Sequence, residues 1–468
     1  MSVATSVSPP MPTSAVFGRS ATLPAFEVDK RKVQSKGIRI AGQSRGSTAN
    51  PWSSLGRATQ LVSVSDWQLF HIAAKTELAR SFSVSEAARR ATCFSLLYDD
   101  LFDWNATHLC LRDGAVNSRK DVARTNAAGR FGESCALRLM QELGFIFWDH
   151  LPTLWNRAKG PITHAEQVSL PKLLVADPSL LPREQPDFIV ENPGMKIALV
   201  EAKGSFATPQ NSPSYYPLPS TAIKQTLNEA LSQLARWPPL ISPGPSSFAV
   251  GTFLREASDG RDPSLIAYAD PEGDAVGEPQ PIRLRPDAIR RGNYGAWLMG
   301  MGFNATGNSL RNGLAAELAR VDLPIVRVEG DDFAFTLNPF CCPCQFPLSF
   351  GGQLLPDGMG IQYLFAKDFD LAYRWFALAR GNIPIIGMEL GTLRVVEAAA
   401  IEARSNSLLE VQGLTRYAQG LKIPPVDSMP TFEPTGFFGS VMPDGTLLGA
   451  IATESPIWGT LRMESFTL

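Results

Sequence analysis

Two short apolar runs near the middle of the chain flank residues that favour a turn. Residues 188–190 and 197–200 are apolar, and Asn192, Pro193 and Gly194 lie between them. Apolar runs bounded by Asn, Pro and Gly are typical of two strands and a tight connection. The pattern therefore predicts an antiparallel hairpin.

Charged residues stand at the open end of this predicted hairpin. If the turn centres near Gly194, Asp187 lies opposite Glu201, because both are equally far from that glycine. Opposed residues of an antiparallel pair share a face. Lys203 shares the face of Glu201, because side chains alternate along a strand. Two carboxylates and an ammonium group are thus expected to converge beside apolar strands.

A helical pattern precedes the hairpin, from about Asp121 to Leu143. Glu133 lies in line with Leu137 and Met140, at helical spacings of four and three. A carboxylate beside an apolar row needs a compensating partner, because an unpaired buried carboxylate is costly. The alternative is a partly exposed glutamate that the helix dipole stabilises. Together with the hairpin, we interpret Glu133 as facing the site.

Capping and periodicity predict most of the other elements. Ser65 to Gln68 and Ser83 to Glu86 have capping-box spacing and open two expected helices. That pair could read DNA as a helix-turn-helix, but we interpret it as packing on the core. The expected helices are 65–80, 83–102, 221–237, 366–380, 394–404 and 407–419, and the expected strands are 145–148, 247–253 and 265–268, with a further hairpin at 435–452.

The hairpin carries a two-part motif, Pro186-Asp187 before the turn and Glu201-Ala202-Lys203 after it. With Glu133 on the preceding helix, this arrangement resembles the PD-(D/E)XK nuclease superfamily, which has the restriction-endonuclease-like fold. The resemblance covers residues 119 to about 270. It implies an α/β fold whose restriction-endonuclease-like core is a mixed sheet flanked by helices.

The resemblance also implies roles for the site residues. Asp187, Glu201 and the backbone carbonyl of Ala202 would hold Mg²⁺ or Mn²⁺, which prefer hard oxygen ligands. Lys203 would hold the attacking water or the charge that develops on the phosphate. Glu133 would support the metal directly, through water, or as part of a second site. The expected catalytic residues are therefore Glu133, Asp187, Glu201 and Lys203.

The domain organisation follows from these elements and from composition. Residues 1–60 are rich in Ser, Pro, Gly and basic side chains, which predicts a disordered basic arm. A helical N-terminal region is expected at 61–118, the nuclease-like core at 119–275, and an α+β C-terminal domain of unassigned role at 276–468.

Composition bounds the class of protein and its partners. With 44% hydrophobic and 19% charged residues and no apolar run of membrane-spanning length, we expect a soluble protein with no membrane partner. Six cysteines in 468 residues do not make a disulfide framework, which fits a cytoplasmic location. A net charge of −2 means that any contact with nucleic acid must use local basic patches.

Three local clusters leave alternatives open. The basic residues between Lys30 and Arg57 could neutralise phosphates or form a solvated linker. A second basic cluster, residues 283–291 beside Trp297, could contact nucleic acid, but a helix with a charged outer face is the commoner explanation. Cysteines at 341, 342 and 344 lack a fourth zinc ligand at useful spacing, so buried free thiols are the default.

The expected function is Mg²⁺-dependent hydrolysis of phosphodiester bonds in DNA by endonucleolytic cleavage. The alternative is a catalytically inactive nuclease-like module that binds DNA or protein, with residues 276–468 as the interaction module. RNA as the substrate, a protein partner and a homodimer stay open. The chain has no GxxxxGK[ST] motif, so a P-loop motor within it is not expected.

Overall fold

The computed structural model describes ten segments of the chain, with gaps of one or two residues inside some of them. They are residues 19–28, 60–80, 101–154, 184–207, 221–258, 264–270, 282–312, 317–337, 382–405 and 436–468. Residues 87, 90, 174–175, 349–350, 353–354, 413–414 and 417 are also described.

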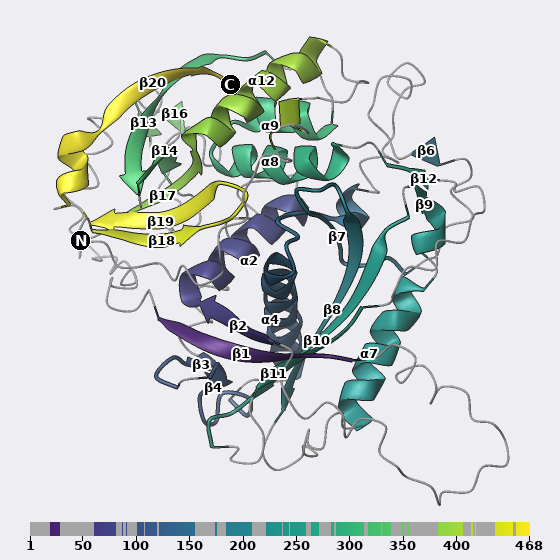
Figure 1. The fold of residues 1–468 in the computed structure, drawn as a ribbon. Helices are drawn as coiled ribbons and strands as arrows, with labels where there is room; N and C mark the ends of the chain where they lie inside the picture. The colour runs from purple at the N-terminus through teal and green to yellow at the C-terminus, as the bar shows by residue number, and fades with distance from the viewer. Residues whose placement is uncertain are drawn as a thin grey trace, which may run out of the picture.

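A seven-stranded mixed sheet occupies one side of the molecule (Figure 1). In spatial order its strands are β2 (Gln60–Ser65), β1 (Ser20–Glu27), β11 (Leu265–Ala269), β10 (Ser246–Arg255), β8 (Ile197–Ala207), β7 (Phe188–Glu191) and β5 (Phe147–His150). The pairs β1–β11 and β8–β10 are parallel, and the other pairs are antiparallel. All of β11 and nearly all of β10 are buried, as expected of central strands covered on both faces.

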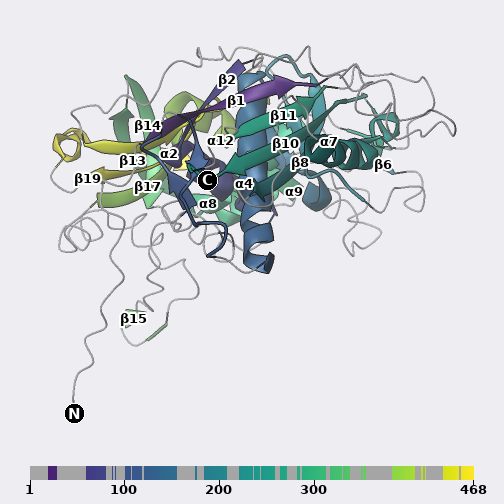
Figure 2. The same cartoon turned by 90° about the horizontal axis from the view of Figure 1, so that it is seen from below.

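Helices α4 (Asp121–Glu142) and α7 (Thr221–Leu234) cover opposite faces of this sheet (Figure 2). A Cβ atom built on Gly204 of β8 would lie 1.7 Å from the carbonyl oxygen of Ala128 in α4. The neighbouring Lys203 pairs instead with Glu229 of α7. Because adjacent side chains of a strand point to opposite faces, the two helices lie on opposite sides. The predicted mixed α/β class, with a mixed sheet flanked by helices, is confirmed.

A second, six-stranded sheet is antiparallel throughout. Its strands in spatial order are β18 (Phe437–Val441), β19 (Thr446–Ala452), β17 (Asn382–Glu389), β14 (Asp331–Leu337), β13 (Arg320–Val328) and β20 (Arg462–Thr467). Alternate residues face two apolar clusters: Ile386 and Leu448 join the large core, whereas Ile385 and Leu447 join a smaller one with Ile457 of the 3-10 helix η3 (Pro456–Thr460). Both faces of this sheet are therefore packed.

Several short elements complete the described fold. They are β3 (Phe102–Asp103) with β4 (Cys110–Leu111), β6 (Leu174–Val175) with β12 (Ile282–Arg283) and β9 (Ile241–Ser242), β15 (Ser349–Phe350) with β16 (Gln353–Leu354), and the 3-10 helix η2 (Pro238–Leu240). Among the residues that the structure describes, no helix combines the length and apolar character needed to span a membrane.

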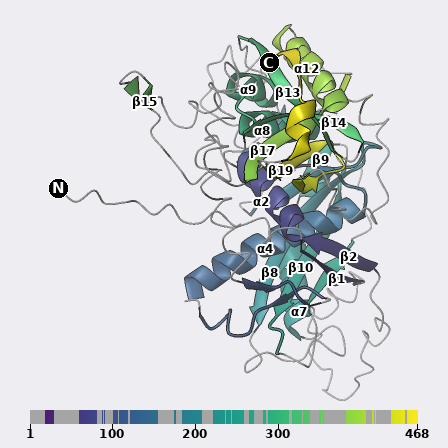
Figure 3. The ribbon, with the colours of Figure 1, turned by 90° about the vertical axis from the view of Figure 1, so that its left-hand side faces the viewer.

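Helices α2 (Asp66–Arg80) and α8 (Ala288–Gly300) connect the two sheets, and α9 (Asn304–Asn312) packs on α8. Helix α2 contacts α4 and β5 of the first sheet's layer and β18 and β19 of the second sheet. Figure 3 shows α2 between α4 and β19. One continuous cluster of buried apolar residues runs from β1 to the C-terminal Leu468. The boundary expected near residue 275 therefore does not separate two hydrophobic cores.

The predicted disordered arm at 1–60 is wrong for residues 20–27. They form β1, which pairs with β2 on one side and β11 on the other. The apolar side chains Leu23, Ala25 and Phe26 are buried there. The region 61–118, expected to be helical, also contributes β2, β3 and β4. Composition misled because one short apolar run stands among polar residues, and its strand partners β2 and β11 both lie farther along the chain.

Most local predictions within the described residues are confirmed. In the capping box, the Ser65 backbone N–H donates to Gln68 Oε1 (3.0 Å), and the Gln68 backbone N–H donates to Ser65 Oγ (3.1 Å). The helix expected at 394–404 is part of α12 (Leu390–Ser405), and the hairpin expected at 435–452 is β18–β19. The basic residues 30–57, the cysteines at 341–344, the helix at 366–380 and most of the helices at 83–102 and 407–419 lie outside the described residues.

The interpretation of the second basic cluster as a charged outer face is wrong for Arg290 and Arg291, the part of the cluster whose side chains the structure describes. Arg290, Arg291 and Trp297 are all buried in α8. Arg290 pairs with Glu191 of β7, and the Trp297 indole N–H donates to the carbonyl of Gly387. These residues join α8 to both sheets, so they are not available at the surface for nucleic acid.

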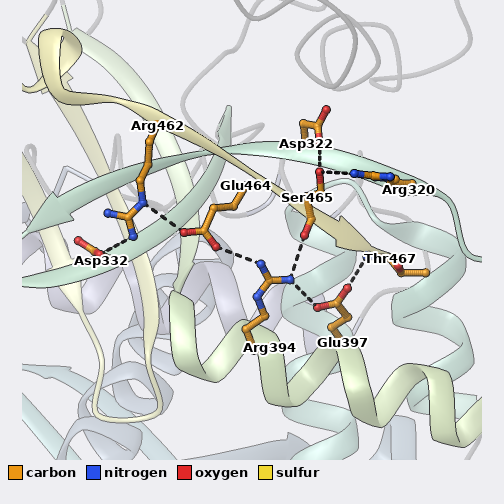
Figure 4. A network of polar contacts seen from close by, with 9 residues as sticks. All are labelled: Arg320, Asp322, Asp332, Arg394, Glu397, Arg462, Glu464, Ser465 and Thr467. Atoms are coloured by element: carbon orange, nitrogen blue, oxygen red, sulfur yellow. Dashed lines mark hydrogen bonds and ion pairs between the residues drawn. The ribbon is translucent and has the colours of Figure 1, made fainter.

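Exposed ion pairs do line the outer strand of the second sheet (Figure 4). Arg462 of β20 pairs with Asp332 of β14, and Arg394 of α12 pairs with Glu397 and Glu464. Such exposed pairs contribute little to stability one by one. They do place charge along an edge strand, which discourages pairing with a second sheet.

Candidate active site at the β7–β8 hairpin

The observed register of the hairpin confirms the predicted opposition of Asp187 and Glu201. Phe188 pairs with Val200 and Glu191 with Ile197, so the next step places Asp187 opposite Glu201. The turn closes through a hydrogen bond from the Met195 backbone N–H to the Asn192 carbonyl (2.9 Å).

Each carboxylate of this pair accepts a hydrogen bond from a backbone N–H of the facing strand segment. The backbone N–H of Asp187 donates to Glu201 Oε2 (3.2 Å), and the backbone N–H of Ala202 donates to Asp187 Oδ2 (3.0 Å). Strand β7 begins at Phe188, whereas β8 continues to Ala207. The pairing with β7 ends before Ala202, and the Asp187 carboxylate therefore accepts the Ala202 N–H in place of a backbone carbonyl.

Lys203 completes the cluster on β8. Its Nζ lies 2.9 Å from Glu201 Oε1 and 3.3 Å from Oε1 of Glu229 on α7. Burial lowers the pKa of Lys203, but the hydrogen bond and charge of Glu201, with those of Glu229, raise it above its ordinary value overall. Lys203 is therefore a protonated ammonium group at neutral pH, which fits charge stabilisation and not proton abstraction.

Close packing of α4 brings Glu133 to the same end of the sheet. A Cβ atom on Gly132 would lie 2.7 Å from the Cα of Gly204, so helix and strand touch backbone to backbone. Glu133 does not pair with Lys203; its Oε2 lies 2.8 Å from Nη1 of Arg80 and 3.5 Å from Nη1 of Arg130. The structure thus places Glu133 in an arginine cluster beside the hairpin.

Sequence reasoning missed the charged residues that surround the predicted ones. Arg80 and the buried Glu77 come from α2, Arg130 from α4 and Glu229 from α7. Glu77 pairs with both arginines, at 3.6 Å for Arg80 and 2.6 Å for Arg130. The only local signal was an acid three residues before an arginine, which occurs on many helices.

Burial raises the pKa of each carboxyl group in the predicted site. It raises the pKa of Glu133 to about 7, against the opposing charge of Arg80. It raises the pKa of Glu201 to about 8, with the negative charge of Asp187 adding to the effect. The pKa of Asp187 is also raised, mainly by burial. Charged carboxylates are costly here, and a bound cation would favour them.

The donor set fits a hydrated divalent cation and not a closed metal cage. Within the described ranges, no group of three or more His, Cys, Asp or Glu side chains is arranged to hold a metal ion. Asp187 and Glu201 form a pair, and no described residue donates a hydrogen bond to Asp187 Oδ1. Mg²⁺ keeps several waters and needs only one or two carboxylates, so Asp187, Glu201 and the Ala202 carbonyl would suffice.

Comparison with known proteins finds no matching family model, no significantly similar curated protein and no significantly similar solved structure. Membership of the PD-(D/E)XK superfamily therefore stays a prediction, which rests on the motif residues and on their geometry.

Proposed function

We propose that this protein is a divalent-metal-dependent nuclease that hydrolyses phosphodiester bonds in DNA, with a restriction-endonuclease-like core made by the mixed sheet, α4 and α7. The observation that carries the proposal is the joint placement of Asp187, Glu201 and Lys203: the Asp187 N–H donates to Glu201, the Ala202 N–H donates to Asp187, and Lys203 pairs with Glu201. Exposed ion pairs are common on protein surfaces. A buried and a half-buried carboxyl group with raised pKa values, beside a fixed ammonium group, are instead typical of functional sites.

Each residue has a role that its position supports. Asp187 and Glu201, with the carbonyl of Ala202, would hold Mg²⁺ or Mn²⁺. When bound, such a cation neutralises a phosphodiester and lowers the pKa of a coordinated water. Lys203 orients the attacking water or stabilises charge on the phosphate, because its ammonium group is fixed by Glu201 and Glu229. Glu133, from α4, would add a further carboxyl group near Asp187.

The test compares the purified protein with its Asp187→Asn variant on plasmid, linear and single-stranded DNA, with Mg²⁺, Mn²⁺ or EDTA. Asparagine can still accept the Ala202 N–H, so the hairpin is expected to stay folded. Cleavage should fall by about two to three orders of magnitude, as should cleavage by Lys203→Met. Asp322→Asn on β13 is the matched control, because Asp322 lies on the other sheet.

Equal cleavage by the wild type, Asp187→Asn and Lys203→Met would refute the proposal. One observation favours the inactive alternative: Lys203 is engaged by two glutamates at once. Binding of DNA without products under every metal condition would support that alternative. An RNA substrate in the same assay shows which nucleic acid is cleaved.

A further inference from the structure

We propose that Arg80, at the end of α2, binds a phosphate oxygen of the nucleic acid beside the candidate active site. Arg80 lies outside the region of the superfamily resemblance, and no sequence motif places it in the site. The inference rests on the proposed function for the identity of the ligand. It adds a phosphate-binding residue from a helix that was expected only to support the core.

The position of the Arg80 guanidinium is the first support. Its Nη1 lies 2.8 Å from Glu133 Oε2, and its Cζ lies 5.5 Å from the ring centre of Phe188, the residue after Asp187. The positive charges of Arg80 and Lys203 both act on Asp187. A phosphate that shares a cation with Asp187 would therefore lie within the field of these two basic groups.

The second support concerns Nε and Nη2 of Arg80, which contact no described acceptor. Its ion pairs with Glu133 and Glu77 both use Nη1, and no described residue accepts a hydrogen bond from its Nε or Nη2. Arg138, on α4, shows the contrast: its Nε donates to the Ser63 carbonyl and its Nη2 pairs with Glu142. Arg138 is engaged as a structural arginine. With respect to the described residues, Arg80 retains Nε and Nη2, the planar donor pair that binds phosphate bidentately.

The last turn of α2 is built to hold Arg80 in place, which is the third support. The buried Arg311 of α9 donates from Nη1 to the Leu78 carbonyl (3.3 Å) and from Nη2 to the Ala79 carbonyl (2.9 Å). Thr153 Oγ1 donates to the Arg80 carbonyl (3.3 Å). Fixed supporting contacts of this kind are what a preorganised binding residue needs. The region beyond residue 280 thereby supports the site.

The experiment measures binding of a labelled DNA duplex and a labelled single strand by fluorescence anisotropy in EDTA, where metal-dependent hydrolysis cannot occur, over a range of salt concentrations. Arg80→Gln should weaken binding about tenfold and reduce the slope of log affinity against log salt by about one. Arg80→Lys should keep the slope, because it keeps the charge, but recover only part of the affinity. Arg462→Gln, the same change on the distant β20, should alter neither.

Unchanged affinity and slope in Arg80→Gln would overturn the inference, and so would lost cleavage with unchanged binding, because Arg80 would then act through Glu133. If thermal unfolding shows that Arg80→Gln is not folded, Arg80→Lys decides, and wild-type affinity in that variant overturns the inference. Arg80-dependent binding without cleavage by the wild type would remove the nuclease proposal and keep this inference. Cleavage that depends on Asp187, together with DNA binding that does not depend on Arg80, would keep the nuclease proposal and remove this inference.

Discussion

The protein has two clusters of charged residues that differ in how their charges are compensated. One lies at the β7–β8 hairpin, and the other lies between α2 and the β18–β19 turn. In the second cluster, Lys75 of α2 pairs with Asp444 of the turn, and both side chains are fully buried. Asn293 and Thr446 also donate to the Asp444 carboxylate, at 2.8 and 2.7 Å. At the hairpin, Asp187 Oδ1 has no such donor among the described residues.

The pKa values express the same difference. Burial raises the pKa of Asp444, but Lys75, Asn293 and Thr446 more than offset this, so its pKa is lowered overall. At the hairpin, the effect of burial exceeds the opposing effect of Lys203, and the pKa of Glu201 rises to about 8. The protein itself compensates Asp444, whereas Asp187 keeps one carboxylate oxygen to which no described residue donates. A complete cluster indicates a structural role, and an incomplete one indicates a binding site.

The largest effect expected from this comparison is on stability. Asp444→Ala leaves Lys75 buried without its counter-ion, so the free energy of unfolding should fall by about 3–5 kcal/mol. Glu201→Gln should cost far less, because glutamine keeps an oxygen that can accept the Asp187 N–H, and Lys203 keeps Glu229 as a counter-ion. Urea unfolding of both variants checks this. A larger loss for Glu201→Gln than for Asp444→Ala would invert the comparison.

The sequence predicted the features that depend on residues close together in the chain. The register that opposes Asp187 to Glu201 follows from one turn and from strand alternation, and the capping box at Ser65 depends on residues three apart. Both signals are local, because their partners lie within a few residues of each other or across one tight turn. The same locality explains why the β18–β19 hairpin was expected.

The sequence could not predict contacts between distant segments. Asp444 lies within the hairpin expected at 435–452, yet it pairs with Lys75, 369 positions earlier. Arg290 was assigned to an outer helix face, because a basic cluster is usually solvated, but Glu191 compensates it inside the protein. Arg80 had no motif to mark it. Each error concerns a buried charge whose partner is far away in the chain, and no local pattern reports such a partner.

A second, smaller effect concerns pH, through His71 next to the Lys75 cluster. His71 is buried, stacks on Trp297 at 4.7 Å between ring centres, and contacts the Ser440 carbonyl through Nδ1 (3.2 Å). Burial, followed by the charge of Lys75, lowers its pKa from 6.5 to about 3. The unfolded chain therefore takes up a proton in a range where the folded chain cannot.

His71 should therefore make the folded protein less stable as the pH falls. Stability that comes from neutral His71 is fully present above pH 6.5 and is lost as the pH falls from 6.5 towards 3. At pH 5 the loss amounts to about 2 kcal/mol for one such group. His71→Phe should shrink the difference in unfolding free energy between pH 7 and pH 5 by about that amount, whatever its effect at pH 7. An identical difference in the variant would show that His71 is not the group that titrates.

The smallest effect is expected at the exposed network of Figure 4, which tests whether burial, and not charge pairing as such, separates the two clusters. Arg462 pairs with Asp332 at 2.6 Å and with Glu464 at 3.2 Å, yet its side chain is 49% exposed. Water and salt already compensate these charges, so Arg462→Ala should leave the urea midpoint within experimental error. A loss as large as that of Asp444→Ala would mean that the number of ion pairs matters more than burial, and the contrast between the clusters would lose its physical basis.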